Sequence, residues 1–138
     1  MYSIGQISQR TGVKVPTIRY YEGMGLLQPI ERTDGNQRRY DRAGLDKLAF
    51  IKHARDLGFS IEAIVALIDL QDHPDRSCQQ ANQIASAQLA DVRDRITKLQ
   101  SLEAELSRIV EHCSGDGAAG RCYVLNSLAD HQLCGGEH

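Results

Sequence analysis

The residues with the most distinctive chemistry in this sequence are four cysteines, all in the second half of the chain: Cys78, Cys113, Cys122 and Cys134. Thiolates are soft donors that suit zinc, cadmium, lead, mercury or monovalent copper. Cys113 and Cys122 enclose a glycine-rich segment at 114–121. Any single cysteine is more often a small buried hydrophobic residue. As a cluster in a reducing compartment, however, they indicate metal or redox chemistry rather than disulfides.

Histidines near these cysteines are secondary candidates. His112 directly precedes Cys113 and could be an auxiliary ligand, although an exposed histidine at a helix end, stabilised by the helix dipole, is the commoner case. His131, Cys134 and His138 could form an auxiliary site in the polar tail, which we expect to be flexible instead. His53 and His73 have no neighbours at ligand spacing, so we expect structural or solvated side chains there.

Charge divides the chain into two unlike parts. Residues 1–58 carry ten Lys and Arg against six Asp and Glu, a net charge of +4, whereas residues 59–138 carry six against twelve, a net charge of −6. A basic front half suggests a polyanionic partner for that half alone. The N-terminus shows no secretion signal and no apolar run approaches the roughly 20 residues of a membrane span. We therefore expect no membrane partner and a cytoplasmic location, where thiols stay reduced.

The elements that must position these residues begin with two short helices. Ser3 is a plausible cap for a helix that ends at Thr11-Gly12, and Pro16 fits the start of a second helix that ends near Gly23 and Gly25. This is the helix-turn-helix pattern. Within residues 29–40, Asp34-Gly35 predicts a hairpin turn, which would make a basic wing.

Helical periodicity returns after the wing. It runs from Arg42 to Leu57, resumes after Ser60 as a cap, and breaks at 72–75. Residues 77–112 then contain no Gly or Pro, which predicts one helix about 54 Å long. Its apolar seam comprises Ala81, Ile84, Ala85, Leu89, Val92, Ile96, Leu99, Leu102, Leu106, Ile109 and Val110. A second copy, parallel or antiparallel, would cover this seam in a coiled coil, the alternative being a helix folded back on its own domain. A loop at 114–121 and a short helix from Tyr123 to about His131 follow.

The N-terminal motifs together resemble the DNA-binding half of the MerR family of bacterial transcription activators. The matching motifs, in order, are Ile4-Gly5, Thr17-Ile18-Arg19-Tyr20-Tyr21-Glu22, Gly25-Leu26-Leu27, Gly35-Asn36, Arg38-x-Tyr40 and Leu57-Gly58-Phe59-Ser60. The match covers nearly all of the first 70 residues, and the long helix with the cysteine loop extends it to about residue 128.

This resemblance implies a mainly α fold with four parts. These are a winged helix-turn-helix domain at 1–70, an antiparallel coiled-coil dimerisation helix at 77–112, a metal-binding loop and short helix at 113–131, and a tail at 132–138. It further implies a nucleoid-associated homodimer that binds a pseudo-palindromic operator in promoter DNA. There it would activate RNA polymerase by distorting a promoter whose elements are spaced too far apart.

Eight residues are the candidate DNA contacts. Lys14, Thr17, Arg19 and Tyr20 lie at the start of the second helix, which would enter the major groove. Side chains on the wing and the following helix would hold phosphates without reading sequence, namely Arg38, Tyr40, Lys52 and Arg55. Each arginine alone could equally be a surface ion-pair partner, but the set favours DNA.

The cysteine positions resemble the metal loop of the family's divalent sensors. In an antiparallel dimer, Cys78 at the start of one long helix would meet Cys113 and Cys122 at the end of the other. Sensors of monovalent copper generally carry serine where Cys78 stands, so a third thiolate favours a divalent ion. Zinc sensors often have a Cys-Cys pair and a loop histidine, which this chain lacks. Asp75-Arg76-Ser77-Cys78 resembles the lead, cadmium and zinc group, with mercury as the next candidate.

Four alternatives differ in the features that they require. A redox sensor with an iron–sulfur cluster would carry four closely spaced cysteines in the loop, where only two occur. A monovalent copper sensor is the other alternative within the family, and a drug sensor would need a sizeable further domain. An enzyme with a thiol or zinc centre is the alternative of another class. We expect no enzyme, because the sequence shows no catalytic triad, phosphate loop or paired carboxylates.

Overall fold

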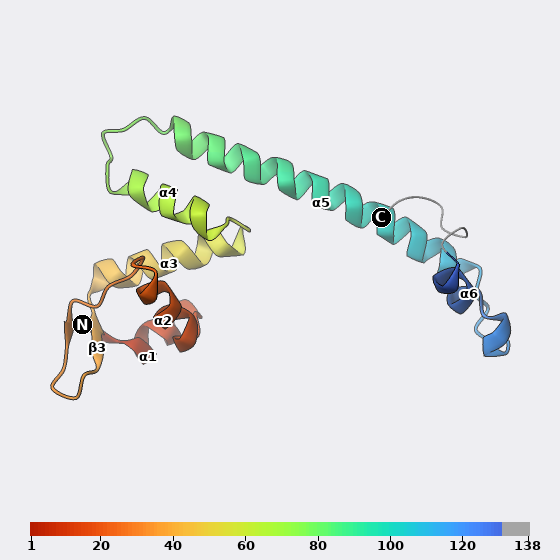
Figure 1. Ribbon diagram of the computed structural model, residues 1–138, viewed down its shortest axis with the longest axis horizontal. Coiled ribbons are helices and arrows are strands. Elements are labelled where there is room, and N and C mark those ends of the chain that lie inside the picture. Colours follow the sequence, from red (N-terminus) through yellow and green to blue (C-terminus); the bar gives the residue numbers. More distant parts are fainter. Residues whose placement is uncertain (131–138) are drawn as a thin grey trace. The chain divides into compact units, whose positions relative to one another are not determined.

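The computed structural model of the chain describes residues 1–130, and the candidate ligand Cys134, like the predicted tail, lies outside them (Figure 1). The chain forms two compact units, one from Met1 to Ile84 and one that begins at Ala85. The fold is mainly helical, with a small sheet in the first unit, which confirms the predicted class. No helix among the described residues is both long enough and apolar enough to cross a membrane.

The first two helices form the helix-turn-helix that the sequence predicts. Helix α1 spans Ile4–Thr11, and its N-terminus is closed by a capping box in which the Gln6 amide donates to Ser3 Oγ at 3.1 Å. Gly12 ends it at φ 78°, a left-handed conformation that glycine adopts without steric cost, and the turn leads into α2 at Val15–Gly23. Pro16 stands in the first turn of α2, where its missing N–H has no cost.

The wing is a hairpin of β2 (Glu31–Arg32) and β3 (Arg38–Tyr40), paired antiparallel with Arg32 opposite Arg38. Asn36 adopts φ 60° in the turn between them. A third strand, β1 (Tyr2–Ser3), pairs with the other edge of β3. The sequence analysis did not predict β1, because two residues are too few to show an alternating pattern.

Helices α3 (Arg42–Asp56) and α4 (Ile61–Gln71) complete the first unit, and α3 lies over the two N-terminal helices (Figure 1). Asp41 and Ser60 cap them by accepting hydrogen bonds from backbone amides in the first turn. The core gathers residues from all these elements: Ile7, Val13, Ile18, Tyr21, Leu26, Leu27, Tyr40, Leu45, Leu48, Ile51, Ala54, Ile64 and Ile68.

Helix α5 spans Gln79–Glu111, so the predicted long helix is confirmed to within two residues at each end. Its 33 residues correspond to a length of about 50 Å. Six large side chains of the predicted seam are exposed in the single chain, from 37% at Val92 to 65% at Val110, whereas Ile109 is buried at 4%. A 3-10 turn at Ala119–Arg121 and helix α6 at Tyr123–Ala129 follow, and α6 lies beside the C-terminal end of α5 (Figure 1).

Candidate metal site and DNA-binding surface

Two of the three predicted metal ligands come together in the second unit. The Sγ atoms of Cys113 and Cys122 lie 3.8 Å apart, and both cysteines are free thiols with half-buried side chains. A tetrahedral zinc ion with Zn–S bonds of about 2.3 Å would hold two sulfurs about 3.8 Å apart. The observed spacing therefore fits two thiolates that share one tetrahedral ion.

Local backbone structure places each sulfur. Cys113 follows the last turn of α5, and its amide donates to the carbonyl oxygen of Val110 at 3.1 Å. Cys122 precedes α6, and its carbonyl oxygen accepts from the Asn126 amide at 3.0 Å. The pKa of the Cys122 thiol is lowered, chiefly by the backbone N–H of Leu125 and to a smaller extent by Cys113 and the Val124 amide, while burial acts in the opposite direction. A lowered pKa favours the thiolate, which is the form that binds metal.

A cleft of about 260 Å³ lies beside the two sulfurs and is lined by the 114–121 loop and the start of α6. His112 borders this cleft, but its ring stacks on Tyr123, with the centroids 4.9 Å apart. Its Nδ1 lies 2.7 Å from the carbonyl oxygen of Arg108. If Nδ1 carries the proton in that contact, Nε2 is left as the only ring nitrogen that could bind an ion.

Cys78 lies in the first unit, between α4 and α5, and is exposed. Its carbonyl oxygen accepts from Asn82 at 2.9 Å, so the residue caps the start of α5. Within residues 1–130 of the single chain, no group of three or more His, Cys, Asp or Glu side chains could hold a metal ion. Two of the predicted thiolates thus lie together in the second unit, whereas Cys78 belongs to the first.

The start of α2 presents three of its four predicted DNA contacts to solvent. Lys14 and Arg19 are exposed, Tyr20 is 57% exposed, and Thr17 is half-buried. The neighbouring residues Ile18 and Tyr21 are buried in the core. Helix α2 therefore packs one face inward and leaves its basic and hydroxyl groups free to reach base edges and phosphates.

The structure corrects the prediction for Tyr40. This side chain has no exposed surface and lies in the core, so it cannot hold a phosphate. Burial and the neighbouring Glu22 carboxylate raise the pKa of its phenol. Because residues two apart in a strand share a face, Arg38 points to the same side as Tyr40. There it forms an ion pair with Glu22, in which Nε lies 2.6 Å from Oε1.

Strand alternation also identifies Arg39 as a basic residue that the sequence analysis missed. Its neighbours on both sides face the core, so its side chain projects from the opposite face of the sheet and is half-buried. Glu22 was assigned no role, although it links α2 to the wing through Arg38. The alternation in Arg38-Arg39-Tyr40 was the available signal for Arg39.

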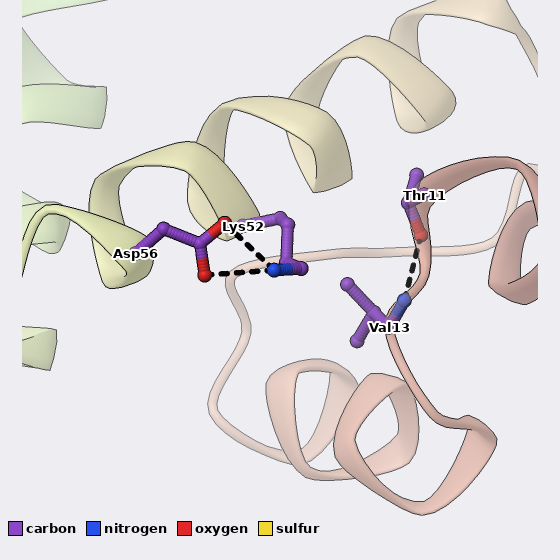
Figure 2. Close-up of polar contacts among 4 residues, drawn as sticks. All are labelled: Thr11, Val13, Lys52 and Asp56. Atoms are coloured by element: carbon purple, nitrogen blue, oxygen red, sulfur yellow. Dashed lines mark hydrogen bonds and ion pairs between the residues drawn. The ribbon is translucent and has the colours of Figure 1, made fainter.

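Lys52 and Arg55 are held by partners on their own helix or just beyond it. Figure 2 shows Lys52 Nζ between the two carboxylate oxygens of Asp56, at 2.7 Å from each, together with the Val13 amide that donates to Thr11 Oγ1 in the helix-turn-helix. Arg55 donates to the carbonyl oxygen of Phe59 at 2.9 Å. Both side chains keep exposed surface, so a phosphate would compete with these intramolecular partners.

Comparisons with known proteins match most of the chain. A family described as MerR HTH family regulatory protein matches residues 2–71, and one described as MerR, DNA binding matches residues 45–109. The HTH-type transcriptional regulator ZntR of Escherichia coli (strain K12) is 37% identical over 130 residues, which cover 93% of this chain and 92% of that protein. The mercuric resistance operon regulatory protein of Serratia marcescens is 36% identical, with 91% and 86% covered.

A solved structure agrees with this assignment. The transcription regulator PbrR691 from Ralstonia metallidurans CH34, crystallised in complex with lead(II), gives a TM-score of 0.76 at 34% identity, covering 93% of this chain and 99% of that one. The likeness extends over nearly all of this chain, and the matched protein is a transcription regulator. This chain belongs to the MerR family of helix-turn-helix DNA-binding transcriptional regulators.

Proposed function

We propose that this chain is a homodimeric transcription activator that responds to a soft divalent metal ion bound by Cys113, Cys122 and the partner's Cys78. The observation that carries the proposal is the 3.8 Å separation of the Cys113 and Cys122 Sγ atoms, which fits a shared ion. Relatives named for heavy-metal dependence, for mercuric resistance and for a lead(II) complex support a metal ligand of this class. Lead, cadmium and zinc are the preferred ions, followed by mercury.

The third thiolate would come from a second copy of the chain. Cys78 precedes α5 and Cys113 follows it, so a helix of about 50 Å separates them within one chain. Two such helices packed antiparallel would place the beginning of one beside the end of the other. The exposed seam of Leu89, Val92, Ile96, Leu99 and Leu106 supports this pairing, because it leaves a long apolar stripe that one chain does not cover.

The ion would act on promoter DNA through the two arrangements available to the dimer. Binding of the ion would fix the 114–121 loop and α6 against α5, and would favour the arrangement in which the bound promoter is distorted toward an active spacing. A ligand shifts such an equilibrium only if it binds one arrangement more tightly than the other. Operator affinity should therefore change little, while transcription by RNA polymerase rises.

Transcription in vitro from the native promoter, with a panel of metals, tests this function. We expect activation by lead, cadmium, zinc or mercury and none by calcium or magnesium, because hard ions prefer oxygen ligands. Cys113→Ser and Cys122→Ser should bind the operator normally and lose induction. Full induction of either variant, or activation in the presence of a strong chelator, would contradict the proposal.

A further inference from the structure

Tyr123, the residue after Cys122, holds α6 against the end of α5. Its ring stacks on His112, with centroids 4.9 Å apart and planes at 27°. The Arg108 guanidinium lies 5.7 Å from the ring centroid and donates a hydrogen bond to the Tyr123 hydroxyl. Arg108 itself forms an ion pair with Glu105, one turn earlier on α5. Tyr123 thus contacts one side chain in the last turn of α5 and one just beyond it, by stacking, cation–π and hydrogen-bonding interactions.

Both residues of the stacked pair are neighbours of a metal-ligand candidate. His112 precedes Cys113 and Tyr123 follows Cys122, so contact between the two rings brings the two cysteines together. His112 is fixed in turn, because its amide donates to the Arg108 carbonyl at 3.2 Å and its Nδ1 contacts the same oxygen. The ring contact beside the two cysteines, and not the loop alone, therefore helps to fix the 3.8 Å separation of the sulfurs.

The loop between the cysteines offers little rigidity of its own. Three of its eight residues are glycines, at 115, 117 and 120, and the remaining side chains of the loop are exposed. An unconstrained glycine-rich segment loses conformational entropy when its ends are brought together. A contact that already holds the ends in the metal-free protein reduces the entropy that metal binding must offset.

We propose that Tyr123 is a positioning residue that preorganises the Cys113 and Cys122 thiolates for a soft metal ion. Tyr123 acts through His112 and Arg108 and does not bind the ion. The inference rests on the proposed function for the nature of the ligand, but the positioning of the two sulfurs rests on contacts within the chain itself. These two parts can be measured separately.

The first measurement is the equilibrium between the two loop thiols and glutathione in the metal-free full-length chain. Cys78→Ser and Cys134→Ser leave only the loop pair, which becomes one disulfide as one oxidised glutathione is reduced to two glutathione thiols. The equilibrium constant reports how close the sulfurs are held. We expect Tyr123→Ala to lower it about tenfold, as for loss of a preorganising contact. Asn126→Ala, at an exposed position on the same helix, should leave it unchanged.

The second measurement is cadmium affinity of the dimer with all its cysteines, by competition with a chelator. Loss of a residue that supports a metal ligand typically weakens affinity by about ten- to a hundredfold, and we expect Tyr123→Ala to fall in this range. Tyr123→Phe keeps the ring on His112 and loses only the hydroxyl contact. We therefore expect the thiol equilibrium constant and the cadmium affinity to fall by no more than about threefold each. That is less than the usual effect of losing one hydrogen bond to a charged group.

The outcomes separate the two proposals. If wild-type protein binds no cadmium while Tyr123→Ala still lowers the thiol equilibrium, the metal-sensing function is wrong and the positioning role stands. If Tyr123→Ala leaves the thiol equilibrium unchanged, the positioning role is wrong, whatever happens to cadmium affinity. A Tyr123→Phe protein as impaired as Tyr123→Ala would overturn the role of ring stacking.

Discussion

Arg38 on the wing and Glu22 on α2 form an ion pair with Nε 2.6 Å from Oε1, in which the glutamate side chain is only 10% exposed. The pair joins the hairpin to the helix that would enter the major groove. Arg42 and Asp46, by contrast, form a pair on the surface of α3 with exposures of 74% and 64%. The chain therefore contains a partly buried arginine pair and an exposed one that serves as its control.

Arg38→Met should lower the free energy of unfolding by about 2 kcal/mol, because it leaves a mostly buried carboxylate without its charged partner. Arg42→Met should cost much less, because solvent screens the exposed pair. Urea unfolding of both variants, followed by circular dichroism, measures the difference. Equal losses would show that the wing does not depend on Glu22.

Arg19→Ala should weaken binding to the operator strongly and reduce the preference for operator over unrelated DNA, because Arg19 is exposed on α2 where base edges would be read. Lys52→Ala should weaken both kinds of DNA alike and reduce the salt slope by about one unit. Arg95→Ala, in the second unit, is the matched control. The assignment of α2 fails if Arg19→Ala binds the operator as wild type does.

Leu99→Lys should dissociate the dimer, because it places a charge in the centre of the apolar seam, where Leu99 is 63% exposed in the single chain. An unpaired charge buried in such an interface costs several kcal/mol. Gln100→Lys, one residue further along and off the seam, should leave the dimer intact. Sedimentation velocity distinguishes the two, and an unaltered Leu99→Lys dimer would refute the coiled-coil pairing.

The lowered pKa of Cys122 predicts that the rate of thiol alkylation depends on pH differently in the folded and the unfolded chain. With the other three cysteines replaced by serine, alkylation by iodoacetamide should reach half its maximal rate at a lower pH in the folded protein than in concentrated urea. The reason is that the Leu125 amide stabilises the thiolate only when α6 is formed. The corresponding stability is present above the unfolded pKa and is lost as pH falls through the folded pKa. Coinciding profiles would exclude this interaction.

Much of the fold could be predicted because short local signals act independently of distant contacts. Ser3 with Gln6, Gly12 and Ser60 mark helix ends in the sequence and do so in the structure. Strand β1 escaped prediction because its partner, β3, lies nearly 40 residues away and supplies its only pairing. Tyr40 was misassigned because a tyrosine beside arginines suggests a phosphate contact, whereas its burial depends on α1, α2 and α3 packing around it.

The candidate site was predictable only in part for a similar reason. The spacing of Cys113 and Cys122 indicated a shared ligand, and the structure places their sulfurs together. The contact of Tyr123 with His112 and Arg108 could not be predicted, because it depends on how α6 returns along α5. Whether the partner's Cys78 joins them is a property of the dimer, and it stays a prediction.

The most direct test of the shared site uses mixed dimers. One subunit carries Cys78→Ser and the other carries Cys113→Ser with Cys122→Ser, and differently tagged subunits allow the heterodimer to be isolated. If each site takes its ligands from both chains, the intact loop of the first subunit faces the intact Cys78 of the second. Metal titration against a competing chelator should then show one ion per heterodimer, bound with wild-type affinity, whereas either parent homodimer binds more weakly. Heterodimers without a high-affinity ion would contradict a site built from two chains, and so would Cys78→Ser homodimers that bind two ions at full affinity.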